Sequence, residues 1–142
     1  MKAFKTMARA LAAALGLWLA GGTAAPAHAA RLVVEVVGLE SDEGAVVVEV
    51  FGSRAGFPRQ PSYTETVAIA GGQARVEFPD LGPSEYVVHV WHDINGNGRL
   101  DRRFGAEPWS YSNSQPGRRA SWEEAALGLG IDPLTVRINL AD

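Results

Sequence analysis

Short runs of alternating, β-branched residues are the feature that most constrains the fold of this chain. They occur at residues 32–37, 45–51, 63–70, 73–78, 85–93 and 134–140, separated by Gly, Pro, Asp and Ser. Period-two alternation and enrichment in valine are typical of β-strands with one buried face. Short strands of this kind, with almost no helix between them, predict an all-β fold, namely an antiparallel β-sandwich of about seven strands.

Turn residues between these runs predict two local pairings. Residues 40–44 form a polar turn of hairpin length between the first two strands. Gly71-Gly72 favours a tight turn between the strands at 63–70 and 73–78, because glycine readily adopts positive φ angles. The sequence therefore predicts a hairpin at each of these turns.

The strand at residues 85–93 and the segment after it differ from the rest of the chain. The strand carries bulky side chains on both faces, so we expect it to lie centrally, with a neighbour on each edge. Residues 94–120 follow without a sustained period, and a loop of 27 residues in a compact domain is usually functional or disordered. Ser121-Trp122-Glu123-Glu124 has the S-x-x-E form of a capping box, which predicts a short helix at 122–127.

The N-terminal residues have the organisation of a secretory signal. Three positive charges and no acid in residues 1–9 precede an apolar run at residues 10–20, and small residues end in Ala27-His28-Ala29. The run is too short to cross a hydrocarbon core of about 30 Å, and A-x-A marks a cleavage site. An uncleaved anchor is the alternative. We expect cleavage near Ala29, a single periplasmic or secreted domain at residues 30–142, and no membrane insertion after signal removal.

The charge and composition of that domain restrict its partners. The whole chain has 13 basic and 16 acidic residues, a net charge of -3. Removal of the three basic residues in the signal leaves 10 basic and 16 acidic residues, a charge near -6. Such a charge disfavours nucleic acid, and the absence of cysteine excludes disulfides, a thiol enzyme and cysteine-ligated metals. An unidentified protein or a glycan remains open as the partner.

Residues 93–101 carry the most specific pattern in the chain. Side-chain oxygens recur at alternate positions, with glycine at the sixth, as in the D-x-[DN]-x-[DN]-G loop that binds calcium. The expected Ca²⁺ ligands are Asp93, Asn95, Asn97, the carbonyl of Arg99, Asp101 and, in place of a final bidentate glutamate, Glu107. With two certain charges we expect weak affinity, on the order of 10⁻⁴ to 10⁻³ M. The alternative is a set of Asx-turns that closes the loop without an ion.

His92 supports a competing interpretation. Beside Asp93 at the mouth of the loop, it could belong to a zinc or copper site. It could also join Asp93 and one nearby serine, at position 110, 112 or 114, in a hydrolase triad. No G-x-S-x-G motif supports the hydrolase, so we expect the protein not to be an enzyme.

Aromatic and polar residues suggest a ligand surface after the loop. Its candidate residues are His92, Trp109, Tyr111, Asn113 and Trp122, with arginines at 102, 103, 118 and 119 nearby. Exposed rings beside fixed polar groups suit sugar or peptide binding, whereas rings that only attach the long loop are the alternative. His89 would lie on the opposite face of the strand from His92, and we expect it to be packed in the sheet.

Four segments form a distinctive set: F-P-D-L-G-P at 78–83, Y-V-V-H-V-W-H-D-I-N-G-N-G-R-L-D at 86–101, Y-S-N at 111–113 and S-W-E-E-A-A at 121–126. Together they resemble the DUF2141 family of exported bacterial proteins of unknown function. The resemblance extends from about residue 32 to residue 140. It implies an immunoglobulin-like or prealbumin-like sandwich in the periplasm or outside the cell, but it supplies no information on activity. The combined prediction is an exported, non-catalytic module whose calcium-stabilised loop presents a ligand surface.

Overall fold

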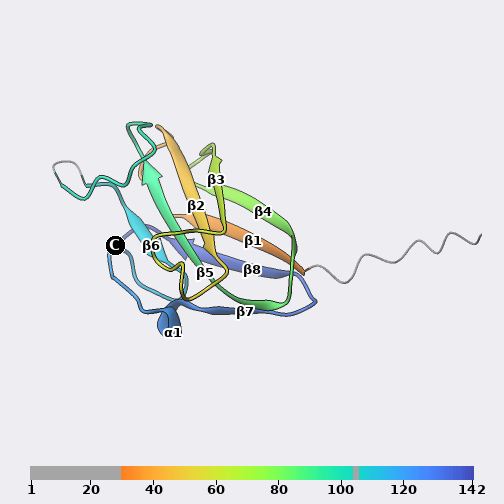
Figure 1. Cartoon of the computed structure of the whole chain (residues 1–142). Coiled ribbons are helices and arrows are strands. Elements are labelled where there is room, and N and C mark those ends of the chain that lie inside the picture. The colour runs from red at the N-terminus through yellow and green to blue at the C-terminus, as the bar shows by residue number, and fades with distance from the viewer. Residues whose placement is uncertain (1–29, 104–105) are drawn as a thin grey trace, which may run out of the picture.

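The computed structural model describes residues 30–103 and 106–142, which form two packed β-sheets (Figure 1). The elements are β1 (Ala30–Val37), β2 (Ala45–Phe51), β3 (Tyr63–Val67), β4 (Ala74–Leu81), β5 (Ser84–Asp93), β6 (Trp109–Tyr111), α1 (Trp122–Ala125), β7 (Leu127–Leu129) and β8 (Leu134–Asn139). One sheet has the order β4-β1-β8; the other has the order β3-β2-β5-β6, and β7 also pairs with β5. The predicted all-β sandwich is confirmed, whereas the predicted signal segment lies outside the described residues.

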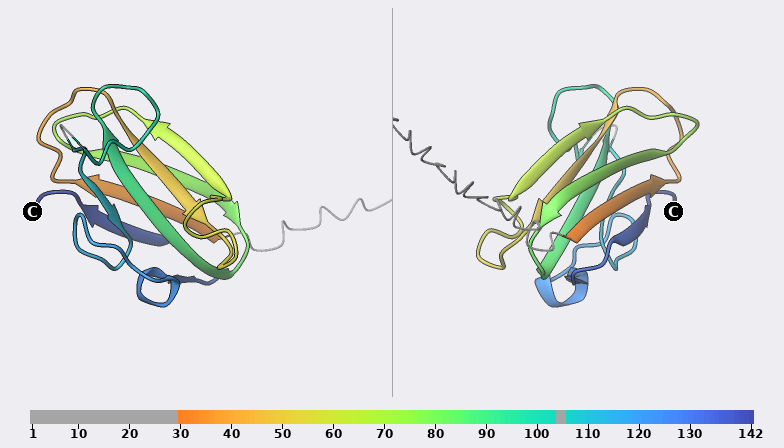
Figure 2. Two further views of the ribbon diagram at one scale, coloured as in Figure 1. Left: turned by 60° about the vertical axis from the view of Figure 1, so that its left-hand side comes forward. Right: turned by 90° about the vertical axis from the view of Figure 1, so that its right-hand side faces the viewer.

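Both predicted hairpins are wrong. β1 pairs with β4 and, in parallel, with β8, whereas β2 pairs with β3 and β5, so residues 40–44 cross between the sheets. β3 and β4 also belong to different sheets (Figure 2). Gly71 and Gly72 take φ angles of 61° and 73° in a tight turn, but this turn closes only an isolated bridge between Ala70 and Gln73. Turn chemistry thus specifies the bend, whereas strand partners are selected by long-range burial.

The main core lies between the sheets and uses the alternate residues of the strands. Its fully buried valines are Val34 and Val36 of β1, Val46, Val48 and Val50 of β2, and Val88 and Val90 of β5. Burying each such side chain stabilises the fold by about 1.5–3 kcal/mol. The intervening residues of β5, such as Val87, point to the outer face of its sheet, where Val87 packs with Phe51, Tyr111 and Trp122. β5 is therefore central and buried on both faces, as predicted.

The predicted loop at residues 94–120 contains β6, and the predicted short helix follows it. The capping box forms: the Ser121 hydroxyl accepts from Glu124 N at 3.3 Å, and the Glu124 carboxylate accepts from Ser121 N at 2.8 Å. α1 ends at Ala125 rather than at the predicted 127, because Leu127 begins β7 and pairs with Tyr86. In the described residues no helix has the length and apolar character needed to span a bilayer.

A tyrosine fixes the start of β5. The Tyr86 hydroxyl donates a 2.7 Å hydrogen bond to the carbonyl of Gly82, four residues upstream. This contact has the form of the tyrosine corner found in immunoglobulin-like sandwiches. Ser84 stands where such sandwiches often have glycine, and the corner forms with serine at that position. The corner holds the strand that delivers Asp93 and the loop after it.

Candidate functional site

The loop after β5 is closed by its own hydrogen bonds. The Asp93 carboxylate, which is 4% exposed, accepts from Asn97 N at 3.1 Å and from Gly98 N at 2.8 Å. Asp101 Oδ2 accepts from the amide Nδ2 of Asn95 at 2.8 Å and of Asn97 at 2.9 Å. The predicted loop residues thus converge, and Asx-turns add to the closure, because the Oδ1 atoms of Asn95 and Asn97 accept from the N–H groups of Asn97 and Arg99.

Glu107 closes the base of this loop. Its Oε1 accepts from Ile94 N at 3.0 Å and its Oε2 accepts from Asp101 N at 2.9 Å. The carboxylate is buried, and the Glu107 N–H donates to the Asp101 carbonyl at 2.8 Å. Arg99 enters the network through its N–H, which donates to the Asn97 side chain at 2.9 Å. Among residues 30–103 and 106–142, no three His, Asp or Glu side chains gather as a metal site would require.

His92 lies on the core side of β5, on the same face as Val88 and Val90. Its side chain is 1% exposed, and its Nε2 is 2.6 Å from the carbonyl oxygen of Glu43. Because a carbonyl oxygen only accepts, Nε2 carries the proton in this contact. The ring therefore attaches the end of β5 to the segment that crosses from β1 to β2.

The three serines considered for a hydrolase are held by backbone groups. The hydroxyls of Ser110, Ser112 and Ser114 donate to the carbonyls of Tyr111, Ala125 and Arg118 at 3.2, 2.6 and 3.4 Å. Ser112 Oγ also accepts from Val88 N at 3.0 Å. Ser112 thereby attaches α1 to β5, whereas the contacts of Ser110 and Ser114 are local.

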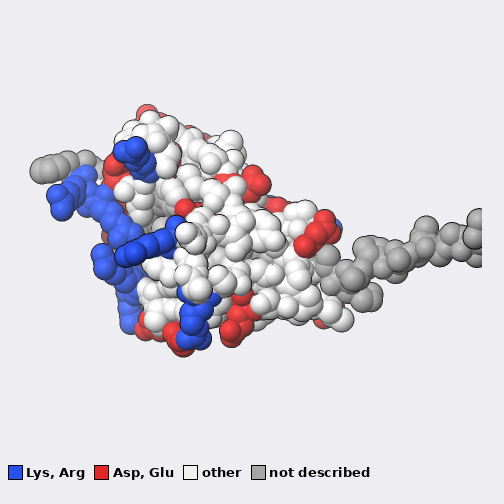
Figure 3. All heavy atoms as spheres, viewed as in Figure 1, with Lys and Arg blue, Asp and Glu red and all other residues white. Residues whose placement is uncertain are grey.

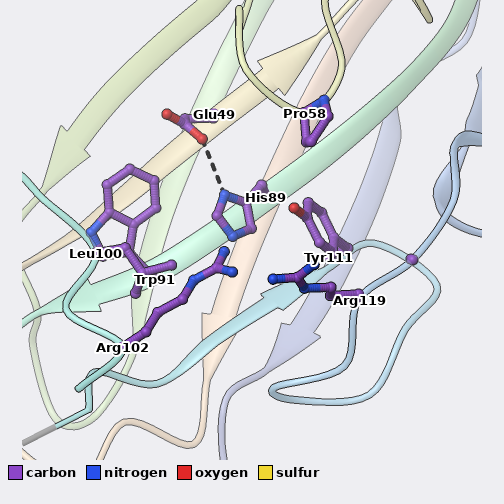
Figure 4. A pocket seen from close by; sticks show the side chains of 9 residues that line it. Glu49, Pro58, His89, Trp91, Leu100, Arg102, Tyr111 and Arg119 are labelled. Carbon is purple, nitrogen blue, oxygen red and sulfur yellow. Dashed lines mark hydrogen bonds and ion pairs between the residues drawn. The ribbon is translucent and has the colours of Figure 1, made fainter.

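A pocket of about 440 Å³ opens on the outer face of the five-stranded sheet (Figure 4). Its lining consists of Glu49 from β2, His89 and Trp91 from β5, Tyr111 from β6, and Pro58, Leu100, Arg102, Arg119 and Ala120 from loops. A cavity of about 300–1,000 Å³ with a few polar groups among apolar ones is typical of small-molecule sites. We call it the β5 pocket.

His89 is the polar centre of the β5 pocket. Its Nδ1 lies 3.1 Å from Glu49 Oε2, and its ring stacks on Tyr111 with 4.5 Å between centroids. The side chain is 6% exposed, and its Nε2 is buried without a hydrogen-bond partner among the described residues. The prediction that His89 is packed in the sheet is confirmed. No local sequence pattern indicates that the ring also lines a pocket, since its partner Glu49 is 40 residues away.

Two arginines flank this pocket. The Arg102 guanidinium stacks over the Trp109 ring, 4.7 Å from its centroid, a geometry typical of cation–π contacts. Burial raises the pKa of Tyr111 above its usual value, and the positive charges of Arg102 and Arg119 partly oppose this rise. Figure 3 shows arginine side chains gathered along one edge of the molecule, where Figure 1 places β6 and the preceding loop.

The predicted ligand surface is divided between several places. Tyr111 lines the β5 pocket, and Trp109 lies half-buried beside it, with 5.7 Å between their ring centroids. Trp122 of α1 is 7% exposed and packs with Phe51 and Val87 on the outer face of the larger sheet. The Asn113 amide donates to the Ala126 carbonyl at 3.0 Å, and His92 lies on the other face of β5. The structure thus brings together two of the five predicted surface residues.

The fold and the pocket define a two-sheet β-sandwich protein with a small-molecule-sized cavity on the outer face of its larger sheet. Residues 34–137 match the profile of the family described as "Uncharacterized protein conserved in bacteria (DUF2141)", and the chain belongs to this family. The resemblance noted from the motifs is thereby confirmed. A search of curated proteins found no match to the chain.

Proposed function

We propose that the chain is an exported, non-catalytic module that binds a ligand in the β5 pocket. The observation that carries the proposal is the buried His89 ring, which lines the pocket with one nitrogen paired to Glu49 and the other without a partner in the part of the chain that the structure describes. Aromatic walls with a few fixed polar groups are suited to binding. Trp91 and Tyr111 supply those walls from a central strand and its neighbour, which hold them rigidly.

Three contacts support a binding role rather than catalysis. A hydrolase triad needs a serine hydroxyl hydrogen-bonded to the histidine that takes its proton. His92 Nε2 instead contacts the Glu43 carbonyl, and Ser112 Oγ contacts the Ala125 carbonyl and Val88 N. Each group performs a structural task in the sandwich.

The proposal also assigns a positioning role to the loop at residues 93–101. Leu100 and Arg102, at the end of this loop, both line the β5 pocket. Calcium is proposed as a weak ligand of the loop, supported by the convergence of the Asn95 and Asn97 side chains on Asp101 and by the D-x-N-x-N-G spacing. In the structure, the Nδ2 atoms of Asn95 and Asn97 face Asp101. Calcium binding therefore requires both side-chain amides to rotate so that their oxygens face the ion.

Export is part of the same proposal, with location in the periplasm or outside the cell. Ala30 is 1% exposed and pairs with Leu81 in β1. Cleavage after Ala29 keeps that buried residue, whereas cleavage after Ala30 removes it. N-terminal sequencing of protein recovered from the periplasm is expected to begin at Ala30; an intact N-terminus would contradict signal cleavage.

Thermal unfolding in the presence of three probe sets tests the binding role. The sets are neutral sugars, uncharged peptides and small carboxylates, applied to the chain as purified after export. A ligand that binds the folded state raises the melting temperature. We expect at least one set to do so, with a reduced shift in Trp109→Ala and an unchanged shift in Tyr63→Ala, an exposed aromatic on β3. No shift with any set would overturn the binding proposal.

A further inference from the structure

We propose that the β5 pocket binds a small organic carboxylate, which pairs with Arg102 and Arg119 while its body contacts the rings of Trp91 and Tyr111. This inference rests on the proposed function, because it names the ligand class of the same pocket. It follows from the arginines, from the unpaired nitrogen of His89 and from the apolar walls.

The two arginines of the pocket have no carboxylate partner among residues 30–103 and 106–142, a property that they share with Arg59, Arg99 and Arg103. Five arginines pair with glutamates, namely Arg31, Arg54, Arg75, Arg118 and Arg137. Arg102 and Arg119 line the pocket without an ion pair among the described residues. Figure 4 shows both guanidinium groups reaching towards the same side of the His89 ring. Two neighbouring positive charges repel, so an anion between them is favoured, and guanidinium groups match the two oxygens of a carboxylate.

The one carboxylate in the pocket wall is already engaged. Glu49 Oε2 contacts Nδ1 of His89, on the side of the ring away from the two arginines (Figure 4). The other ring nitrogen, Nε2, is buried and has no hydrogen-bond partner within residues 30–103 and 106–142. Nε2 accepts a hydrogen bond when the ring is neutral and donates one when it is protonated. A polar atom of the ligand can therefore satisfy this nitrogen in either state.

The remaining walls favour an organic body over a bare inorganic anion. Pro58, Leu100 and Ala120 add apolar surface to the aromatic rings. A small inorganic ion would leave this surface in water, whereas a ring attached to the carboxylate would cover it. The excess of acidic residues in the chain does not prevent an anion from binding. At physiological salt the Debye length is about 8 Å, so repulsion from acidic residues farther away is largely screened.

Probe titrations separate the carboxylate from the body that carries it. Benzoate and glucuronate are the ring carboxylates, benzyl alcohol and glucose their neutral counterparts, and inorganic phosphate the bare anion. Binding is followed by tryptophan fluorescence and calorimetry on the exported chain. We expect at least one ring carboxylate to bind about tenfold or more tightly than its neutral counterpart and than phosphate, as charge-assisted pairing requires.

Matched arginine variants locate the binding. Arg102→Gln and Arg119→Gln are each expected to weaken carboxylate binding about tenfold or more. Arg103→Gln makes the same change of charge at the neighbouring exposed residue, which does not line the pocket, and is expected to change affinity less than about twofold. His89→Phe keeps a ring beside Tyr111 but removes Nε2, and is also expected to weaken binding.

The outcomes distinguish this inference from the proposed function. Equal binding of a carboxylate and its neutral counterpart, equal loss in Arg102→Gln and Arg103→Gln, or binding of phosphate alone would overturn the carboxylate assignment. Binding of neutral sugars or peptides without carboxylates would overturn it and leave the module function intact. Failure of every probe would overturn both. Circular dichroism of each variant verifies that it is folded.

Discussion

The Nε2 atom of His92 lies 2.6 Å from the carbonyl oxygen of Glu43. This contact joins the C-terminal end of β5 to the segment between β1 and β2, which crosses from one sheet to the other. His92 is 1% exposed, so water cannot readily replace either partner. The histidine considered for metal binding or catalysis thus has an evident structural task at the end of the sandwich.

We expect His92→Phe to lower the free energy of unfolding by about 1–3 kcal/mol, because the Glu43 carbonyl loses its donor. Urea unfolding measures the change. Tyr63→Phe, at an exposed residue, is the control and should change stability by less than about 0.5 kcal/mol. A His92→Phe protein as stable as the wild type would show that this contact contributes nothing.

The strands were predictable because the residue pattern within each strand indicates β-structure by itself. Alternating valines mark β1 and β2 without any knowledge of their neighbours, and the bulky residues of β5 reveal burial on both faces. The pairing was not predictable from the turns. Residues 40–44 have the length of a hairpin, but β1 and β2 belong to different sheets, and their valines pack in the one core between those sheets.

The candidate site was predictable only where its residues are close in sequence. The 93–101 pattern correctly indicated a set of converging polar side chains. The β5 pocket was missed as a unit because it assembles residues as distant as Glu49 and Arg119. His89 and Tyr111 pair across β5 and β6, a register that no local pattern of the chain reveals.

Two glycines with the same backbone conformation should respond differently to alanine. Gly44 and Gly96 both have a φ of +69°. A side chain at Gly96 meets open space, whereas one at Gly44 would overlap the backbone carbonyl of Asp93. We expect Gly96→Ala to cost about 1–2 kcal/mol from backbone strain, and Gly44→Ala to cost clearly more, as urea unfolding would show. Equal losses would mean that the crossover segment moves freely away from β5.

Glu107→Gln should open the loop at residues 93–101. Both Glu107 oxygens accept from backbone N–H groups, of Ile94 and Asp101. Glutamine offers one acceptor and places an NH₂ group against the second donor, so we expect a loss of about 1–3 kcal/mol. Hydrogen exchange of the two amides should accelerate. Glu40→Gln, at an exposed glutamate, should leave the exchange unchanged; equal exchange in both variants would contradict the role of Glu107.

Alkaline pH should destabilise the fold through its buried tyrosines. Burial raises the pKa of Tyr111 and the pKa of Tyr86, whereas an unfolded tyrosine ionises near pH 10. Above about pH 10 the unfolded state releases these protons first, so the stability present below that pH is lost as pH rises through the folded-state pKa. Urea unfolding from about pH 8 to about pH 11 should show a shallower loss in Tyr111→Phe than in the wild type. An identical pH dependence would exclude a contribution from Tyr111.

Calcium should stabilise the chain through the loop at residues 93–101. With the expected affinity of 10⁻⁴ to 10⁻³ M, about 10 mM Ca²⁺ adds about 1.4–2.7 kcal/mol, which raises the melting temperature by several degrees. Asp101→Asn should abolish the rise, because Asp101 supplies one of the charges expected at the ion. Asp132→Asn removes an equal charge at an exposed residue outside the loop and should keep it. No rise, or the same rise in Asp101→Asn, would contradict calcium binding; a zinc-dependent rise lost in His92→Phe would favour the transition-metal alternative.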